Sequence, residues 1–324
     1  MFEKVELALT AAFKKEMPGG NVRIHIDASK KDIKVLRQME VVEVVEDSET
    51  QITLEQAHET SKRHKIGSIV EYEHKTKTFG RMAAQSAKQV IIQGIREAER
   101  GMMIKEYEEK HGDIITAVVE KVDPPTGNLI LNTGTSYATL LKGEQLPGDN
   151  YDVDSHIKVL VSEVRKDPSG PRSPLVTLTR THANFVRRLM ELEIPEISSG
   201  VVTITNIARE PGSRTKVAVD SEHEGLDPVG ACIGNRGVRI TQITNELNGE
   251  KIDVIRHSDN PAEFVRAALA PAAINEVIIA DERSCRVVVD ADQLSLAIGR
   301  EGQNARLAAR LTGYKIDIKT TRFD

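Results

Sequence analysis

The chain has 324 residues, 39% of them apolar, which is typical of two to four compact domains with buried cores and excludes a disordered protein. Its net charge of −5, with no segment in which Lys and Arg outnumber Asp and Glu, excludes a protein that coats nucleic acid by bulk positive charge. Charged residues interrupt the apolar ones in residues 1–10 and leave no apolar h-region, so we expect no signal peptide, and no apolar run reaches the roughly 18 residues of a membrane span. We therefore expect a cytoplasmic protein that does not contact membranes.

Residues 1–111 are predicted to form an α+β head that ends in a long connector helix. Apolar residues at helical spacing predict a helix over 2–13, and alternating patterns predict strands at 22–26, 41–45 and 68–72. A further helix is predicted over 81–110. Its apolar stripe is expected to face a core; alternatively, this helix holds the head away from the rest of the chain. The stripe consists of Ala87, Ile91, Ile95, Ala98 and Met102.

Residues 112–180 contain five short alternating segments separated by turn residues. This pattern is typical of a small closed β-barrel, and the five-stranded OB fold is the leading candidate. A barrel with a purely structural role is the alternative. OB folds often stack bases on aromatic rings, and only Tyr137 and Tyr151 are available here, so the stacking signal is weak. The predicted strands are 114–122, 129–132, 137–141, 156–164 and 175–178.

Residues 181–257 and 258–324 are two copies of one unit. Each reads helix, strand, strand, helix, helix, strand, beginning with the helices 184–192 and 261–269. The middle strands 216–220 (KVAVD) and 286–290 (RVVVD) match, as do the last strands 251–254 (KIDV) and 315–318 (KIDI). The first copy has an insertion before its third helix, in which Asp227-Pro228 predicts a surface turn.

A Gly-x-x-Gly loop joins the last two helices of each copy, at 234–237 and 299–302. Two glycines three positions apart allow a tight turn, because glycine adopts positive φ without steric cost and has no Cβ to hold a ligand backbone away. The helix after the loop directs its N-terminal N–H groups at it, which favours phosphate. A helix-packing turn is the alternative for one such loop, but its duplication in full context favours a repeated binding site.

A KH domain clamps about four nucleotides of single-stranded RNA with such a loop. We predict that Ile233 and Ile298 form the edge of the base groove and that polar loop residues contact phosphates. Because Glu301 opposes Arg300, the first loop is predicted to be the stronger clamp. The predicted RNA-binding residues are the two loops, the isoleucine before each and one arginine on each following helix: Ile233, Gly234, Asn235, Arg236, Gly237, Arg239, Ile298, Gly299, Arg300, Glu301, Gly302 and Arg306.

Sequence patterns for catalysis are missing. The nine histidines form no zinc motif, and there is no nucleophile elbow, no Gly-Lys-Thr phosphate loop and no third glycine of a dinucleotide fingerprint. Asp281-Glu282 is expected to be a solvated turn, and Cys232 and Cys285 are expected to be buried apolar residues. We expect no enzyme activity, no cofactor and no metal. An RNA-processing enzyme and a ribosome-associated binder are the alternatives.

With these features in place, nearly the whole chain resembles the NusA family of bacterial transcription factors. Long runs carry the resemblance, namely 79–90 (FGRMAAQSAKQV), 208–216 (AREPGSRTK), 227–234 (DPVGACIG) and 294–304 (LSLAIGREGQN).

The resemblance implies a head domain that binds RNA polymerase near its RNA exit channel, an OB domain of the ribosomal-protein-S-one type and two tandem type II KH domains that bind nascent single-stranded RNA. It implies a role in pausing, intrinsic termination and, with other antitermination factors, antitermination. We expect a monomer. The acidic C-terminal repeats of some members are not expected here, nor is autoinhibition by them.

Overall fold

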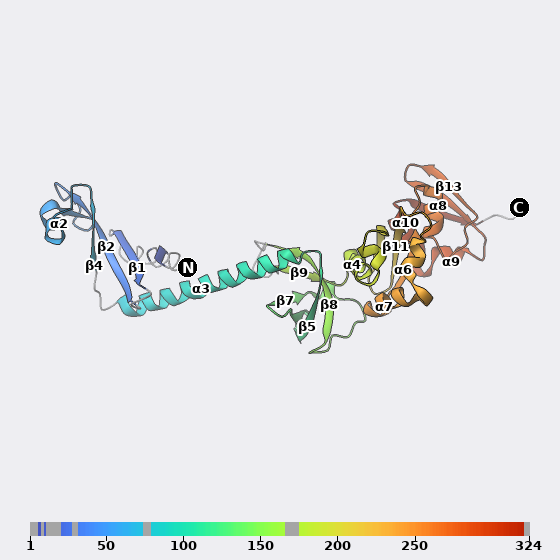
Figure 1. The fold of residues 1–324 in the computed structure, drawn as a ribbon, viewed down its shortest axis with the longest axis horizontal. Coiled ribbons are helices and arrows are strands. Elements are labelled where there is room, and N and C mark those ends of the chain that lie inside the picture. The colour runs from blue at the N-terminus through green and yellow to red at the C-terminus, as the bar shows by residue number, and fades with distance from the viewer. Residues whose placement is uncertain are drawn as a thin grey trace. The chain divides into compact units, whose positions relative to one another are not determined.

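A computed structural model describes residues 6, 7, 10, 21–27, 32–73, 79–165 and 175–320 (Figure 1). The chain divides into two compact units, unit 1 (residues 1–103) and unit 2 (residues 104–324). None of the described helices combines the length and the apolar character that a membrane crossing requires. The helix predicted over 2–13 lies mostly outside the described residues.

Unit 1 is built on a four-stranded sheet around β2 (Asp32–Val42). β2 pairs antiparallel with β1 (Asn21–Asp27) and β4 (Ile69–Glu73), and parallel with β3 (Gln51–Thr53). The strands predicted at 22–26 and 68–72 are therefore confirmed, whereas the one at 41–45 is shifted, because β2 begins at Asp32 and ends at Val42. Helix α2 (Leu54–Thr60), which the sequence pattern missed, packs Ala57 into a core with Met39, Val41, Ile52 and Val70.

The predicted long helix is present as α3 (Phe79–Glu109). The prediction that its stripe faces a core is wrong for the three described members, because Ile95, Ala98 and Met102 are exposed. Helical spacing shows that these residues share a face, and it does not show that a second layer covers that face. Near its end the helix is anchored: Tyr107 is buried, and its hydroxyl lies 2.7 Å from Thr133 Oγ1.

Unit 2 begins with the predicted five-stranded barrel, nearly closed and consistent with an OB fold. All its strand pairs are antiparallel, in the order β7-β6-β5-β8-β9, and β7 also contacts β9. Alternate residues fill the interior, among them Val119, Leu131 and Val159. The strands are β5 (Ile114–Val122), β6 (Leu129–Asn132), β7 (Tyr137–Leu140), β8 (His156–Val164) and β9 (Val176–Thr179).

Two units with the predicted helix-strand-strand-helix-helix-strand order come after the barrel. In each, the middle strand pairs antiparallel with the first and parallel with the last. The first KH unit contains α4 (Ala183–Glu193), α5 (Pro195–Ser198), β10 (Thr203–Glu210), β11 (Arg214–Asp220), α6 (Pro228–Ile233), α7 (Val238–Glu246) and β12 (Lys251–Arg256). The second contains α8 (Pro261–Ala268), β13 (Glu276–Asp281), β14 (Ser284–Val289), α9 (Leu294–Ile298), α10 (Gln303–Thr312) and β15 (Lys315–Thr320).

The Asp227-Pro228 pair differs from its prediction as a surface turn. Pro228 is buried and is the first residue of α6, and the Asp227 carboxylate caps that helix by accepting from Val229 N at 3.1 Å. Proline fits this position because the first helical N–H has no intrahelical partner and the ring fixes a helical φ. The insertion therefore sets the start of the helix that leads into the first loop.

The two KH units share a packed core between them, in addition to the first unit's own core. The sheet of the first unit is covered on its inner face by its own helices and on its outer face by α8 and α10 of the second. Strand β11 is consequently buried on both faces: Val217 and Val219 point inward, and Lys216 and Ala218 point toward the second unit. Lys216 Nζ donates to Asp253 and to the carbonyl of Ala270, both at 3.0 Å.

The barrel is joined to the first KH unit by a buried arginine. Arg180 is 4% exposed and donates to Asp149 Oδ2 at 3.1 Å, to the carbonyl of Lys158 at 2.6 Å and to the carbonyl of Glu246 at 2.8 Å. A guanidinium offers five donors in a rigid fork, so one side chain can fix three segments. The barrel and the KH units therefore present their surfaces in a defined arrangement.

Candidate nucleic-acid interface

The two Gly-x-x-Gly loops adopt the same backbone conformation. Gly234 has φ 74° and ψ 174°, and Gly299 has φ 75° and ψ 171°. The third loop position is left-handed in both copies although neither residue is glycine: φ is 53° at Arg236 and 52° at Glu301. Because a left-handed conformation is unfavourable for such residues, its occurrence twice shows a conformation that the surrounding structure imposes.

The first glycine of each loop is required by space as well as by φ. A Cβ at Gly234 would lie 2.8 Å from Cγ of Arg239, and one at Gly299 would lie 2.8 Å from the backbone N of Asn304. The second glycines, Gly237 and Gly302, have ordinary left-handed φ and no such contact closer than 3.9 Å. The first glycine therefore lets the loop fold closely against the start of the next helix.

The helices after the loops have N-termini suited to an anion. α7 begins at Val238 and α10 at Gln303; neither helix has a side-chain cap, and neither carries an acidic residue in its first turn. A hollow of about 630 Å³ lies over the first loop and is lined by Gly230, Gly234, Asn235, Arg236, Val238 and Arg239. The N–H of Val238 donates to the carbonyl of Asn235 and that of Gln303 to the carbonyl of Arg300, so phosphate binding would rest on the helix dipole and on N–H groups further into each first turn.

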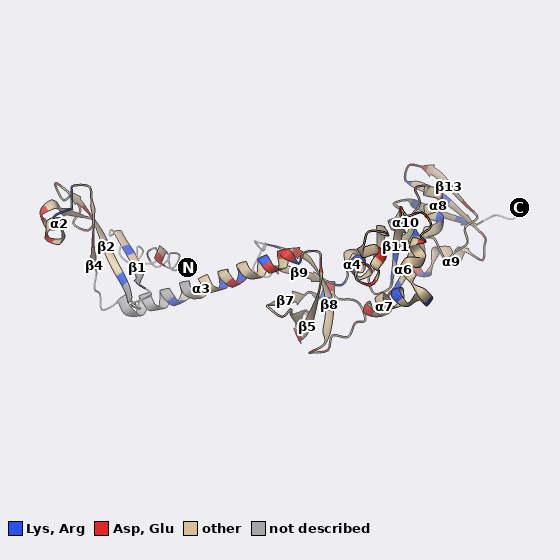
Figure 2. Ribbon diagram, in the orientation of Figure 1, with Lys and Arg blue, Asp and Glu red and all other residues tan. Residues whose placement is uncertain are grey.

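The predicted groove edge and phosphate contacts lie on the surface. Ile233 and Ile298 are exposed to 37% and 38%, as expected for residues that could contact bases. Asn235 and Arg236 are also exposed. Arg300 is 93% exposed, and its Nε lies 3.8 Å from Glu301 Oε1. Figure 2 shows acidic and basic residues interspersed along the described ribbon, which agrees with a site that depends on a few placed groups.

Arg239 has a structural partner that the sequence did not reveal. Its Nη1 donates to the carbonyl of Ala231 at 2.6 Å and to Glu196 Oε2 at 2.8 Å. The equivalent residue of the second copy, Asn304, donates to the carbonyl of Leu296, which is the equivalent of Ala231, at 3.3 Å. In both copies this position ties the loop to the preceding helix. Phosphate contact by Arg239 stays a prediction.

Arg306 is also held by protein groups. Its Nε and Nη2 donate to the two carboxylate oxygens of Glu210 at 2.6 and 3.1 Å, and its Nη1 donates to the carbonyl of Glu301 at 3.1 Å. Glu210 belongs to the first KH unit and Glu301 to the second loop. Hydrogen bonding to Arg306, followed by that to Gln303, keeps the pKa of Glu210 below its usual range, so this carboxylate is charged at neutral pH.

A buried ion pair stabilises the first KH unit. Glu250 is fully buried and accepts from Arg209 Nε at 3.0 Å, from Thr215 Oγ1 at 2.6 Å and from Gly212 N at 2.8 Å. A buried carboxylate needs several donors to offset its lost hydration. Residues 208–216, which resemble the NusA family in sequence, therefore also stabilise the fold of the first KH unit.

Aromatic residues of the barrel are placed unequally. Tyr137 is 59% exposed, whereas the Tyr151 hydroxyl accepts from Leu146 N and donates to Asp149, both at 3.0 Å. Burial raises the pKa of Tyr151 to about 12. Of the two rings that could stack on bases, Tyr137 is thus the more accessible one.

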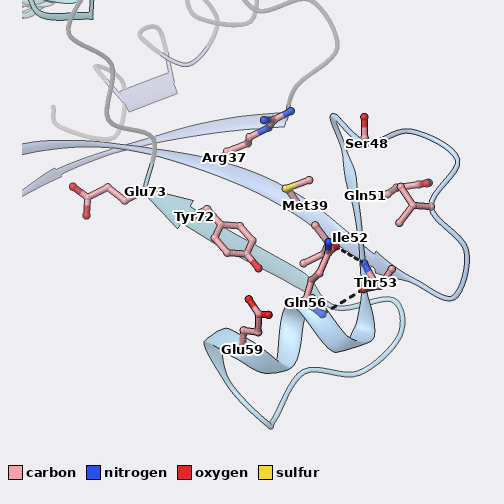
Figure 3. A pocket seen from close by; sticks show the side chains of 11 residues that line it. Arg37, Met39, Ser48, Gln51, Ile52, Thr53, Gln56, Glu59, Tyr72 and Glu73 are labelled. Carbon is pink, nitrogen blue, oxygen red and sulfur yellow. Dashed lines mark hydrogen bonds between the residues drawn. The ribbon is translucent and has the colours of Figure 1, made fainter.

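Unit 1 has a hollow of its own, of about 720 Å³ (Figure 3). Met39, Ile52 and Tyr72 supply apolar lining, and Glu59 and Glu73 are acidic residues that also line it. Arg37, which also lines it, donates to the carbonyl of Glu49 at 2.8 Å. This mixed lining favours a protein surface over a phosphate group. Among the described residues, no cluster of His, Cys, Asp and Glu could hold a metal ion.

Comparison with known proteins identifies related sequences along the chain. The profile of the NusA N-terminal domain matches residues 1–101, that of the NusA-like first KH domain matches 180–257 and that of the second KH domain matches 261–323. The transcription termination/antitermination protein NusA of Bacillus subtilis is 41% identical over 322 residues, which are 99% of this chain and 85% of that protein. The same-named proteins of Halalkalibacterium halodurans (41% identity, 99% of this chain, 83% of the relative) and Thermus thermophilus (40%, 93% and 77%) are similar.

Proposed function

We propose that this chain, which belongs to the NusA family, is a transcription factor that binds RNA polymerase and the nascent transcript and thereby modulates pausing, intrinsic termination and antitermination. Its relatives are named as transcription termination/antitermination proteins, and its two KH domains bind RNA. The observation that carries the proposal is the pair of Gly-x-x-Gly loops with matching dihedral angles, each at the start of a helix without a side-chain cap.

We assign a role to each part of the chain. Residues 1–111 bind RNA polymerase, with the hollow of unit 1 as a candidate contact. Residues 112–180 form an OB domain whose accessible ring is Tyr137. Residues 181–257 and 258–324 are the KH domains that hold single-stranded RNA through the two loops. The protein works as a monomer in the cytoplasm, together with other antitermination factors, and needs no cofactor.

Low affinity for free RNA is consistent with a protein that binds RNA polymerase and the transcript together. The net charge of −5 supplies no long-range attraction to a polyanion, so the KH loops depend on backbone N–H groups and a few arginines. Binding to polymerase would place the loops near the transcript and raise its effective concentration. We therefore expect modest affinity for free RNA and a strong effect on transcription.

Transcription in vitro on a template with a hairpin-dependent pause tests the proposal. Addition of the full-length protein is expected to lengthen the pause and to increase release at an intrinsic terminator. A chain with both Gly234→Asp and Gly299→Asp, which places a carboxylate at each loop, is expected to bind polymerase normally and to lose most of this effect. Unchanged pause lifetimes with the wild-type protein would refute the proposal.

The two loops can be ranked with the same variants taken singly. The first loop carries Arg236, whereas the second carries Arg300 beside Glu301, so Gly234→Asp is expected to weaken RNA binding more than Gly299→Asp. Equal losses would contradict this ranking. Pull-down with the tagged full chain separates the partners: recovery of RNA polymerase supports the proposal, and recovery of ribosomal subunits alone favours a ribosome-associated binder.

A further inference from the structure

The second loop is connected to the first KH unit through one guanidinium. Arg306 donates to both carboxylate oxygens of Glu210, at 2.6 and 3.1 Å, and to the carbonyl of Glu301, at 3.1 Å. Glu301 is the left-handed residue of the second loop. A strand end in one KH unit and a strained loop residue in the other therefore share a single planar side chain.

Further polar groups fix the Glu210 carboxylate in place. Gln303 donates to Glu210 Oε2 at 2.8 Å and to Ser213 Oγ at 2.7 Å, and Arg310 Nη1 lies 3.9 Å from Glu210 Oε1. Three side chains of α10 thus converge on one acidic residue of β10. The Glu210 side chain is 21% exposed, so few water molecules compete with these donors for its carboxylate oxygens.

Among the described residues, the first loop has no equivalent of this connection. The residue that corresponds to Arg306 is Thr241, whose hydroxyl donates to the carbonyl of Gly237 at 2.8 Å on its own helix. The residue that corresponds to Glu301 is Arg236, which has the same left-handed φ. The connection is therefore a property of the second loop and does not arise from the KH fold alone.

We infer that Glu210 is a positioning residue for RNA binding by the second loop: through Arg306 it holds the carbonyl and the left-handed backbone of Glu301, and so couples the second RNA site to the first KH unit. The inference rests on the proposed function and adds a residue that lies outside both loops. In this inference Arg306 stabilises the loop by hydrogen bonding to its backbone, whereas the sequence predicted that it contacts phosphate.

Neutralising two carboxylates, those of Glu210 and Glu301, distinguishes a positioning role for Glu210 from simple repulsion of phosphate by its charge. Removing a negative charge beside an RNA site strengthens binding when the charge only repels phosphate. Glu301, whose side chain is 83% exposed, is such a charge, so Glu301→Gln is expected to raise RNA affinity about twofold to threefold, as one exposed charge allows. Glu210→Gln removes the same charge but also the anchor of Arg306, and is expected to lower affinity about fivefold, within the range for coupled contacting residues.

The experiment uses the full chain and a fluorescein-labelled, unstructured RNA of about 12 nucleotides, long enough for two sites of about four each. Fluorescence anisotropy measures the affinity of the wild-type protein, Glu210→Gln and Glu301→Gln. Arg306→Lys is a third variant, which keeps the charge and loses the fork. It is expected to reproduce the loss seen in Glu210→Gln, and the double variant is expected to lose no more than either single one. An increase in affinity for Glu210→Gln would overturn the inference.

Amide hydrogen exchange of the free protein supplies a readout that needs no RNA. In Glu210→Gln and Arg306→Lys, exchange is expected to accelerate at residues 300–302 and to stay unchanged at 235–237, whereas a general loss of stability would accelerate both. Unchanged exchange at 300–302 would overturn the inference. If the wild-type protein binds no RNA, the proposed function fails, and the exchange data still decide whether Glu210 holds the loop.

Discussion

Replacing the glycines of the loops by alanine should produce a ranked set of stability losses. At Gly299 the backbone has φ 75° and ψ 171°, a region that only glycine adopts readily, which costs about 1–3 kcal/mol for alanine. The new Cβ would also lie 2.8 Å from both Cβ and N of Asn304. Overpacking of this kind costs about 1–3 kcal/mol. Together they cost about 4 kcal/mol, and alanine recovers about 0.4–1 kcal/mol by restricting the unfolded chain, which leaves a loss of about 3 kcal/mol in the free energy of unfolding for Gly299→Ala.

The other glycines lose less because their surroundings differ. At Gly234 the backbone strain is the same, but the new Cβ would meet Cγ and Cδ of Arg239, and a side chain can shift where a backbone cannot. A net loss of about 2 kcal/mol is therefore expected after the same unfolded-state recovery. At Gly237 and Gly302 only the left-handed strain of about 1–2 kcal/mol applies. Alanine recovers about 0.4–1 kcal/mol by restricting the unfolded chain, which leaves about 1 kcal/mol.

Urea unfolding followed by far-UV circular dichroism measures these differences, since the chain has no tryptophan to report by fluorescence. The expected order of loss is Gly299→Ala, then Gly234→Ala, then the two second glycines. Gly94, in the exposed part of α3 with nothing within 4 Å of a new Cβ, is the matched control and should gain stability on substitution by alanine. Equal losses at Gly299 and Gly302 would show that the loop relaxes around the new side chain, and would refute the steric argument.

Three further results are expected. Arg180→Ala should cost about 3–5 kcal/mol in urea unfolding, because Arg180 is 4% exposed and pairs with two carboxylates, whereas Arg300→Ala, at a 93% exposed side chain, should change stability by less than about 0.5 kcal/mol. Burial raises the pKa of Cys232 to about 12 and also raises that of Cys285, so neither thiol should react with a disulfide reagent at pH 8 until urea unfolds the protein; rapid reaction in the native state would contradict this. The pKa of Glu210 lies below its ordinary value of 4.5, so the stability advantage of the wild-type protein over Glu210→Gln should be complete above pH 4.5 and disappear as pH falls through the lowered pKa; an advantage that grows on acidification would be the wrong sign.

Local patterns in the sequence were enough for most elements of the fold. The alternating apolar residues of the barrel strands are a local pattern, and the match of 216–220 with 286–290 is a repeat that the sequence shows directly. The five-stranded barrel and the duplicated unit were therefore predicted. The KH loops were found because two glycines and a helix start mark them directly. The left-handed backbone at the third loop position could not be predicted, because neither arginine nor glutamate, the residues at 236 and 301, favours that conformation.

Long-range partners could not be predicted in this way. Phosphate contact by Arg239 and Arg306 stays a prediction, but their bonds to Glu196 and Glu210, which lie 43 and 96 positions away, could not be foreseen. The sequence pattern of an arginine in the first turns of a helix is the same whether its partner is a ligand phosphate or a carboxylate distant in sequence. The stripe on α3 was misjudged for a related reason: spacing reports a shared face, and only the tertiary structure shows what covers it.

The double burial of β11 has a consequence for how many such units can be stacked. In the first KH unit, the outer positions of the sheet are Ala208, Lys216, Ala218 and Ile255, all buried under the second unit. The corresponding positions of the second unit, by strand register, are Ile278, Arg286, Val288 and Lys319, of which only Val288 is not exposed.

Long charged side chains thus occupy much of this face, as in the terminal repeat of a solenoid, where a polar surface stops the array. A designer who wished to add a third KH unit would first have to change β13 and β15, making Lys319 apolar and shortening Ile278. Conversely, a first KH unit separated from the second would expose an apolar sheet around a lysine adapted to burial, and should aggregate unless that face is made polar.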